Sequence, residues 1–181
     1  MHRQPLLTAL AAYRMRHPDE AATAERFIEF VKGHASCFQR SLELPGHVTG
    51  SAWIVAPEGD AVLLTHHRKL DLWIQLGGHA DGNPDALDVA LREGLEESGL
   101  PSLEPLAAEL PFDIDIHTIP ARKTEPAHEH FDVRYAFQAP HRDFVVSPES
   151  HDLAWVPIAE LRTYTQDASV LRMAHKWLTR R

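Results

Sequence analysis

Three glutamates lie close together in a stretch of the sequence that follows a pair of glycines. Gly77 and Gly78 come first, and Glu93, Glu96 and Glu97 follow in the segment LREGLEESGL. On a helix, residues three and four positions apart share a face, so the three carboxylates would converge on one patch. Mg²⁺ and Mn²⁺ prefer such oxygen ligands, whereas Zn²⁺ prefers histidine or cysteine. A solvated acidic helix face has the same spacing, so the spacing alone leaves both interpretations open.

The residues around the glutamates predict the helix that positions them. Asn83 is a suitable N-cap, Pro84 suits the first helical position, and Asp85 suits the positive end of the helix dipole. Ser98-Gly99 is expected to end the helix. The residues that repeat at helical spacing and should face the core are Leu87, Ala90, Leu91, Gly94 and Leu95. A glycine at position 94 also predicts a close approach to a strand.

The stretch resembles the Nudix box, G-x5-E-x7-R-E-U-x-E-E-x-G-U, in which U is a bulky apolar residue. Gly78 opens the box, and the segment from Arg92 to Leu100 matches every defined position of its end except the first U, which is Gly94. Pro84 stands where the family has its first glutamate. The resemblance covers residues 46–161, including the later segment PESHDLAWVPIAEL.

The resemblance implies both a fold and an activity. Nudix enzymes hydrolyse a diphosphate linked to another moiety X, usually in a nucleoside diphosphate derivative, on an α/β/α sandwich. Transferred residue by residue, Glu93, Glu96 and Glu97 are implied ligands of Mg²⁺ or Mn²⁺, the Gly77 carbonyl is an additional one, and Arg92 orients the carboxylates. The cation would neutralise the diphosphate and lower the pKa of the attacking water, and a carboxylate such as Glu96 or Glu97 would remove the proton.

Two further acidic residues have open interpretations. Glu149 lies six residues before Trp155, in a loop that leads into a strand. Some family members place a metal-binding or catalytic glutamate there, and the alternative is an exposed loop acid. Because Pro84 cannot pair with Arg92 as the family's first glutamate does, Asp88, four residues before that arginine, is the candidate to replace it.

Cationic and histidine residues before the box are candidates for substrate binding. Arg68 and Lys69 lie just ahead of it and could bind phosphates, although a solvated hairpin turn is the alternative. His79 directly follows the glycine pair, so we expect it near the metal site.

The segment HEHFDVRYAFQ is the other concentration of polar residues. In a strand, His130, Asp132 and Arg134 share one face, and the alternating aromatic and valine residues form a core face. His130 and Arg134 are therefore candidates to line the substrate cleft. A zinc site from His128, His130 and Asp132 is an alternative, but it would need a ligand from elsewhere and no cysteine is near. We therefore expect the histidines to shape substrate affinity and to hold no metal.

The remaining sequence predicts a helical extension, residues 1–45, before a Nudix domain, residues 46–181. Residues 6–41 carry apolar residues at helical spacing, whereas short strands separated by turns begin at Ser51. The box helix, further strands and a C-terminal helix follow. This order predicts an α/β (α+β) fold, and with the resemblance an α/β/α sandwich with a mixed sheet.

The composition of the chain limits the classes of partner that it is expected to bind. The formal net charge of -8 argues against a nucleic-acid polymer, and no apolar run reaches the length of a membrane span. A single cysteine, Cys37, is typical of a reducing cytoplasm. We expect a small diphosphate substrate, a nucleotide derivative. The N-terminal helices could form a homodimer interface or cover the cleft.

Three functions are compatible with this sequence. A metal-dependent Nudix diphosphohydrolase is favoured, because a non-catalytic nucleotide-binding module of the same fold tends to lose the box carboxylates, and all three are present. A prenyl-diphosphate isomerase relies on a cysteine in its pocket, and Cys37 lies outside the resembling region. The sequence contains no motif that identifies X.

Overall fold

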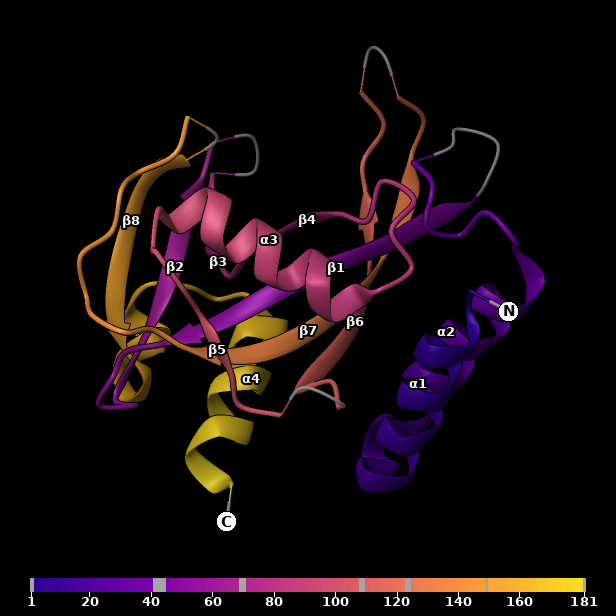
Figure 1. Cartoon of the computed structure of the whole chain (residues 1–181), viewed down its shortest axis with the longest axis horizontal. Coiled ribbons are helices and arrows are strands. Elements are labelled where there is room, and N and C mark those ends of the chain that lie inside the picture. Colours follow the sequence, from indigo (N-terminus) through magenta and orange to yellow (C-terminus); the bar gives the residue numbers. More distant parts are fainter. Residues whose placement is uncertain are drawn as a thin grey trace. The chain divides into compact units, whose positions relative to one another are not determined.

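The computed structural model describes residues 2–40, 45–68, 71–107, 110–122, 125–148 and 150–180 (Figure 1). The helices and strands are α1 (Gln4–Arg16), α2 (Ala21–Gly33), β1 (Gly46–Val55), β2 (Ala61–His67), β3 (Leu72–Ile74), β4 (Leu76–His79), α3 (Ala86–Ser98), β5 (Glu104–Pro105), β6 (Asp113–Ile119), β7 (His128–Gln138), β8 (Ser150–Pro157) and α4 (Ala168–Thr179), with short 3₁₀ helices η1 (Pro18–Glu20) and η2 (Ile158–Thr163). Within these ranges no helix is both long and apolar enough to cross a membrane.

By its internal contacts the chain divides into two compact units. The first unit comprises Met1–Gly50, Gly78–Ala90 and Ala107–Tyr135, and the second comprises Ser51–Gly77, Leu91–Leu106 and Ala136–Arg181. Four elements, β1, β4, α3 and β7, contribute residues to both units. The predicted division of the chain between residues 45 and 46 stays a prediction.

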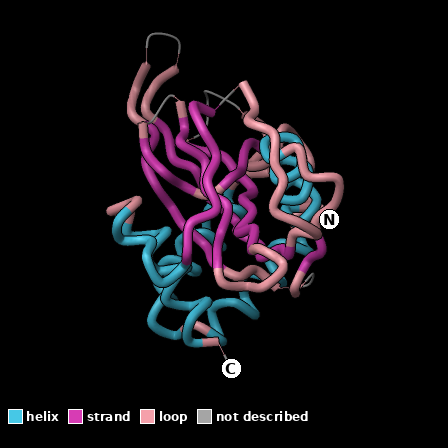
Figure 2. Tube along the Cα trace, turned by 90° about the vertical axis from the view of Figure 1, so that its left-hand side faces the viewer, coloured by secondary structure: helices cyan, strands magenta, loops and turns pink. Residues whose placement is uncertain are grey.

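The strands form a mixed sheet, as predicted. Hydrogen bonds link them in the order β3-β2-β1-β7-β5, with β4 paired to β1, β6 to β7 and β8 to β2 (Figure 2). β2 is antiparallel to β1, β3 and β8, and β7 is antiparallel to β5 and β6. β1 and β7 run parallel: Glu129 N donates to Pro45 O and Ala139 N donates to Val55 O, so the partners advance together along both strands.

In the second unit, Figure 1 shows α3 in front of the strands and α4 behind them. Asp167 caps α4 by accepting hydrogen bonds from the backbone N–H groups of Ser169 and Val170. Farther along α4, the indole of Trp177 is buried and donates to Gly59 O at 2.9 Å. Helices on both faces of a mixed sheet confirm the predicted fold class.

The aromatic face of β7 joins the N-terminal helices to the strands of the first unit. Phe131 is buried, its ring stacks on Phe30 of α2 at 3.7 Å between centroids, and Phe27 meets it edge-on at 5.4 Å. Val133 and Tyr135 on the same face are also buried, which confirms the predicted core face. Helix α2 therefore shares a hydrophobic core with β7.

The box helix begins two residues later than predicted. Asn83 was expected to cap it and Pro84 to open it, but α3 starts at Ala86. The cap is Asp85, whose Oδ1 accepts the backbone N–H of Leu87 at 3.1 Å and that of the next residue at 3.2 Å. Asn83 instead forms a turn, because its Oδ1 accepts the N–H of Asp85 at 3.0 Å. Both residues are good caps, so the sequence alone did not distinguish them.

The buried face of α3 is rotated about the helix axis from the predicted one, because Ala86, Val89 and Ser98 are buried although they were not predicted to face the core. Ala90 and Gly94 are buried, but Leu87, Leu91 and Leu95 are only half-buried. The core-facing side of α3 therefore lies beside the predicted one, and the three leucines lie on its flank. At Gly94, a Cβ would lie 2.9 Å from Leu103 Cδ1 and 3.1 Å from Ala52 Cβ. This confirms the predicted close approach to a strand.

Restoring the family's bulky residue at position 94 is expected to destabilise the protein. Gly94→Leu improves helix propensity by about 1 kcal/mol, but the side chain must displace Leu103 and Ala52. We expect the free energy of unfolding to fall by about 1–3 kcal/mol, the usual cost of overpacking a core. Urea denaturation measures it.

Gly33→Leu is the matched control, because a Cβ at Gly33 meets nothing within 4 Å. Equal stabilities of the two leucine variants would contradict the close packing at Gly94.

Candidate active site

The box glutamates of α3 differ in their surroundings. Glu97 is 6% exposed, and its Oε2 accepts the backbone N–H of Gly77 at 3.1 Å. The side chain of Glu93, one helical turn earlier, is 14% exposed and that of Glu96 is 62% exposed. Burying a carboxylate is costly unless it has partners. Glu97 is thus held against the glycine pair and is not part of a solvated helix face.

Arg92 bridges the other two carboxylates. Its Nη1 lies 2.8 Å from Glu93 Oε1 and 3.6 Å from Glu96 Oε2. One guanidinium therefore offsets part of the repulsion among three like charges. The carboxylate of Asp88 accepts a hydrogen bond from Asn83 Nδ2 at 2.7 Å. The pairing of Asp88 with Arg92 stays a prediction.

The donor set at this place fits a hard divalent cation. Glu93, Glu96 and Glu97 carry three formal negative charges, against one positive charge on Arg92. Oxygen donors of this kind are those that Mg²⁺ and Mn²⁺ accept. The backbone N–H of Gly77 in β4 donates to Glu97, so the carbonyl of the same glycine is a candidate for an additional ligand. The assignment of these four residues as ligands stays a prediction.

Two of the predicted site residues, Lys69 and Glu149, lie outside the residues that the structure describes. Their neighbours are placed. Arg68 Nη2 donates to the carbonyl of Ser150 at 2.9 Å, and the Ser150 hydroxyl lies 2.6 Å from that of Thr65. These contacts join the end of β2 to the start of β8. A role for Arg68 in binding phosphate stays a prediction.

Five histidines gather in the first unit: His47 on β1, His79 on β4, His117 on β6, and His128 and His130 on β7. The register of β6 and β7 places His117 directly opposite His130, with ring centroids 5.3 Å apart. The centroid of His47 lies 4.8 Å from that of His130, 5.0 Å from that of His79 and 5.1 Å from that of His128. The sequence singled out His79 and His130 but not His47, because only strand pairing brings it near them.

Burial favours the neutral imidazoles of His47, His79 and His130. It lowers the pKa of His47 to about 4 and that of His130 to about 2, with the neighbouring histidines adding to the effect. Burial, followed by the charge of Arg40, also lowers the pKa of His79. At neutral pH each ring therefore keeps an unprotonated nitrogen.

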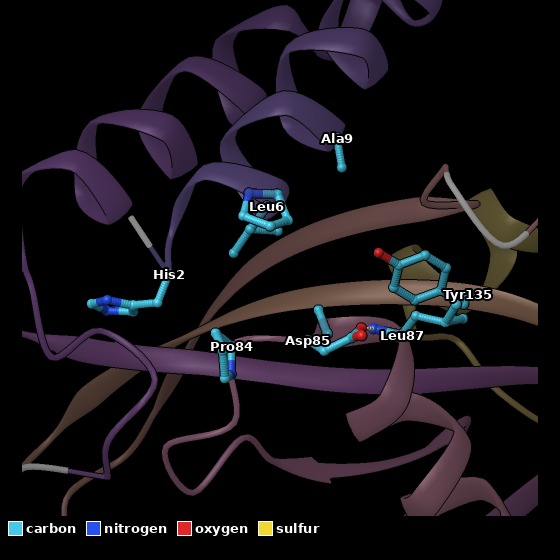
Figure 3. Close-up of a pocket in the computed structure, with 9 residues that line it drawn as sticks. His2, Leu6, Ala9, Pro84, Asp85, Leu87 and Tyr135 are labelled. Atoms are coloured by element: carbon cyan, nitrogen blue, oxygen red, sulfur yellow. Dashed lines mark hydrogen bonds between the residues drawn. The ribbon is translucent and has the colours of Figure 1, made fainter.

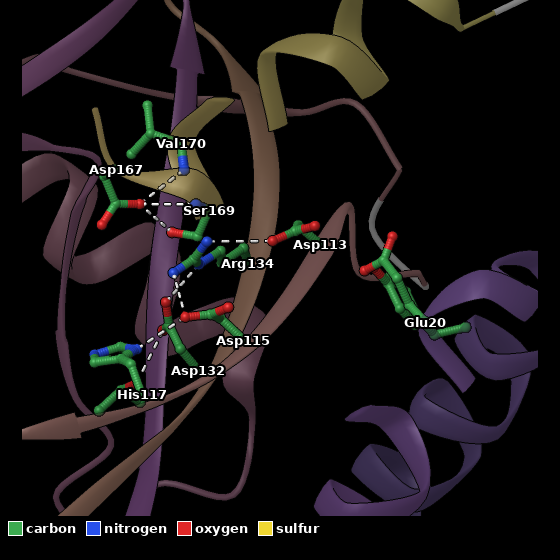
Figure 4. Close-up of polar contacts among 11 residues, drawn as sticks. Glu20, Asp113, Asp115, His117, Asp132, Arg134, Asp167, Ser169 and Val170 are labelled. Atoms are coloured by element: carbon green, nitrogen blue, oxygen red, sulfur yellow. Dashed lines mark hydrogen bonds and ion pairs between the residues drawn. The ribbon is translucent and has the colours of Figure 1, made fainter. Parts of the chain in front are cut away.

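Arg134 lies in a buried ionic cluster (Figure 4). Its Nε donates to Asp132 at 2.7 Å, and its Nη atoms lie 3.2 Å from Asp113 and 3.4 Å from Asp115. Burial alone would lower the pKa of Arg134, but the three carboxylates outweigh it and raise the pKa above its ordinary value. Arg134 and Asp132 are each 2% exposed, and Thr49 also donates to Asp132 at 2.9 Å. The guanidinium is engaged by protein carboxylates, and a role for it in substrate binding stays a prediction.

A cavity of about 270 Å³ lies where α1 faces the start of the box helix (Figure 3). Leu6 and Ala9 of α1 line one side, Pro84 and Leu87 line another, and Tyr135 of β7 completes the wall. Burial raises the pKa of Tyr135 to about 12. The position of the family's first glutamate is therefore occupied by proline at the wall of this cavity, next to the exposed Asp85, which also lines it.

A mixed sheet, with the glutamate-bearing helix next to a glycine pair, defines the class to which this chain belongs. The model of the NUDIX domain matches residues 46–178. The chain is therefore a member of the NUDIX domain family. No curated protein sequence matches the chain significantly.

Solved structures of the family share this fold. A NUDIX-family hydrolase from Clostridium perfringens is 24% identical, with a TM-score of 0.55 over 72% of this chain and 95% of its own. The dihydroneopterin triphosphate pyrophosphohydrolase of E. coli is 18% identical, with a TM-score of 0.56 over 74% of this chain and 94% of its own. The NUDIX domain of Shewanella oneidensis NrtR, complexed with ADP ribose, is 16% identical, with a TM-score of 0.51 over 71% of this chain and 84% of its own. At these identities the similarity shows the fold alone.

Proposed function

We propose that this protein is a metal-dependent diphosphohydrolase that cleaves a nucleoside diphosphate linked to another moiety X. The observation that carries the proposal is the position of Glu97, buried and hydrogen-bonded to the glycine pair. It stands on the same helix as Glu93 and Glu96, which Arg92 holds together. A purely structural acidic face would leave all three carboxylates in solvent.

Each residue of the box has a proposed role. Glu93, Glu96, Glu97 and the Gly77 carbonyl hold Mg²⁺ or Mn²⁺, and Arg92 keeps two of these carboxylates in position. When bound, the cation neutralises the diphosphate and lowers the pKa of the attacking water. Glu96 has the most exposed of the three side chains, which suits a carboxylate that exchanges protons with water, and Glu149 is the other proposed base.

Substrate contacts are proposed on both sides of the box. Arg68 and Lys69 supply positive charge for phosphate oxygens. His79 and His130, both half-buried and with pKa values lowered by burial, offer ring nitrogens to polar groups of the substrate. The structures of relatives extend the candidates for X: one relative is a dihydroneopterin triphosphate pyrophosphohydrolase and another binds ADP ribose.

A substrate panel tests the proposal. The purified protein is incubated with nucleotide sugars, ADP-ribose, dinucleoside polyphosphates, coenzyme A and nucleoside triphosphates, with Mg²⁺ and with Mn²⁺, and released nucleotide or phosphate is measured. We expect metal-dependent release from at least one class. Tight binding of a nucleotide without any release would overturn the proposal in favour of a non-catalytic binding module.

The prenyl-diphosphate isomerase hypothesis is further weakened by Cys37. This residue is buried in the first unit, and burial raises the pKa of its thiol to about 11. Such a thiol is a small apolar group and not a reactive one.

A cytoplasmic location and a homodimer stay proposals, which subcellular fractionation and light scattering would test.

A further inference from the structure

We propose that His47, His79 and His130 form a binding site for a transition metal of the Zn²⁺ class, distinct from the glutamate site. All three residues belong to the first unit, whereas the box glutamates belong to the second. One ring nitrogen from each histidine lies within 4.8 Å of those from the other two. Imidazole nitrogens suit Zn²⁺, Ni²⁺ and Cu²⁺ and are poor ligands for Mg²⁺.

The three ring nitrogens come from three different strands. Alternation along one strand alone therefore did not predict that they lie together. His47 comes from β1, His79 from β4 and His130 from β7. The sequence-based expectation was that the β7 histidines hold no metal, because alternate residues of one strand lack further ligands. The hydrogen-bonded strands provide those ligands. In a tetrahedral zinc site the nitrogens lie about 3.4 Å apart, so small rotations of the rings would close the site.

Two of the ring nitrogens lack partners. Nε2 of His47 and Nε2 of His130 are buried and have no hydrogen-bond partner among the residues that the structure describes. A buried polar nitrogen without a hydrogen-bond partner has a cost in stability. Both rings keep a lone pair, so a cation that accepts both nitrogens would remove this cost.

Two further histidines lie beside the rings of the proposed ligands. His128 is oriented by a hydrogen bond between its Nδ1 and the carbonyl of Pro126 at 3.0 Å, and its ring lies 5.1 Å from that of His47. His117 is oriented by Asp115, at 3.1 Å from its Nδ1, and its ring lies 5.3 Å from that of His130. Three nitrogen ligands leave one tetrahedral position open to water or to an anion.

Metal binding to the full-length protein tests the site without an activity assay. Chelator-treated protein is titrated with Zn²⁺ by calorimetry, and Co²⁺ is used as a spectroscopic probe of tetrahedral nitrogen ligation. We expect one Zn²⁺ per chain, bound in the presence of excess Mg²⁺ and raising the melting temperature by mass action. His47→Gln and His130→Gln should each weaken binding by at least about 10²-fold, because each removes a ligand.

Two control variants separate this site from other sources of zinc binding. His175→Gln alters an exposed histidine on α4 and should bind zinc like wild type. Glu97→Gln alters the glutamate site and should also bind zinc like wild type, whatever its effect on hydrolysis. Loss of zinc in Glu97→Gln, unchanged zinc affinity in both His47→Gln and His130→Gln, or no stoichiometric binding to wild type would each overturn the proposal. If His130→Gln does not fold, His79→Gln takes its place.

Discussion

Glu97→Gln is expected to lower turnover of every accepted substrate by at least about 10²-fold, the scale of losing one electrostatic or acid-base group. Glutamine has nearly the same shape, and its side-chain oxygen can still accept the hydrogen bond that Gly77 N gives to Glu97 at 3.1 Å. The fold should therefore persist. The lost negative charge matters most as charge develops on the phosphate in the transition state, so the fall should appear in kcat.

Steady-state kinetics on a substrate identified in the panel measures this effect. Glu29→Gln, an exposed glutamate on α2, is the matched control and should keep wild-type rates. Thermal melting with and without Mg²⁺ provides a second readout: the metal should raise the melting temperature of wild type more than that of Glu97→Gln. Wild-type rates in both Glu97→Gln and Glu96→Gln would mean that the cluster is not catalytic.

The parts of the site that local sequence could predict are those on one helix. Glu93, Glu96 and Glu97 are three or four residues apart, so helix geometry alone relates their side chains. Arg92 lies on the same turn, and its contacts with two of these glutamates follow from the same spacing. The glycine pair was visible in the sequence, but helix spacing does not relate it to Glu97. The role of the Gly77 carbonyl as a ligand came only from the resemblance to the Nudix box, and the hydrogen bond from Gly77 N to Glu97 places the two residues together.

Features of the site that depend on strand pairing could not be predicted from the sequence. Alternation predicted that His130 and Asp132 share a face of β7, but not which residues lie opposite them. The register with β6 places His117 opposite His130 and Asp115 opposite Asp132. One end of this polar face thereby becomes a histidine cluster and the other a buried ionic cluster. Because register is decided by contacts between distant segments, a single sequence without an alignment does not reveal it.

Arg134→Met is expected to reduce the free energy of unfolding by about 3–5 kcal/mol, the cost of removing one partner from a buried ionic cluster. The guanidinium of Arg134 is 2% exposed and lies within 3.4 Å of three carboxylates, two of which are fully or almost fully buried. Methionine fills a similar volume but leaves Asp113, Asp115 and Asp132 to repel one another where water cannot screen them.

Urea denaturation of paired variants separates this effect from the simple loss of an ion pair. Arg26→Met removes the guanidinium that lies 2.6 Å from Glu129 in the same unit, but the side chain of Arg26 is 55% exposed. Exposed pairs contribute about 0–1 kcal/mol, so this control should be nearly neutral. Adding Asp113→Asn and Asp132→Asn to Arg134→Met should recover part of the lost stability, because two of the unpaired charges are then gone. If Arg134→Met were no more destabilising than Arg26→Met, the arginine would not be what holds these carboxylates together, and its proposed role in substrate binding would become the better explanation of its position.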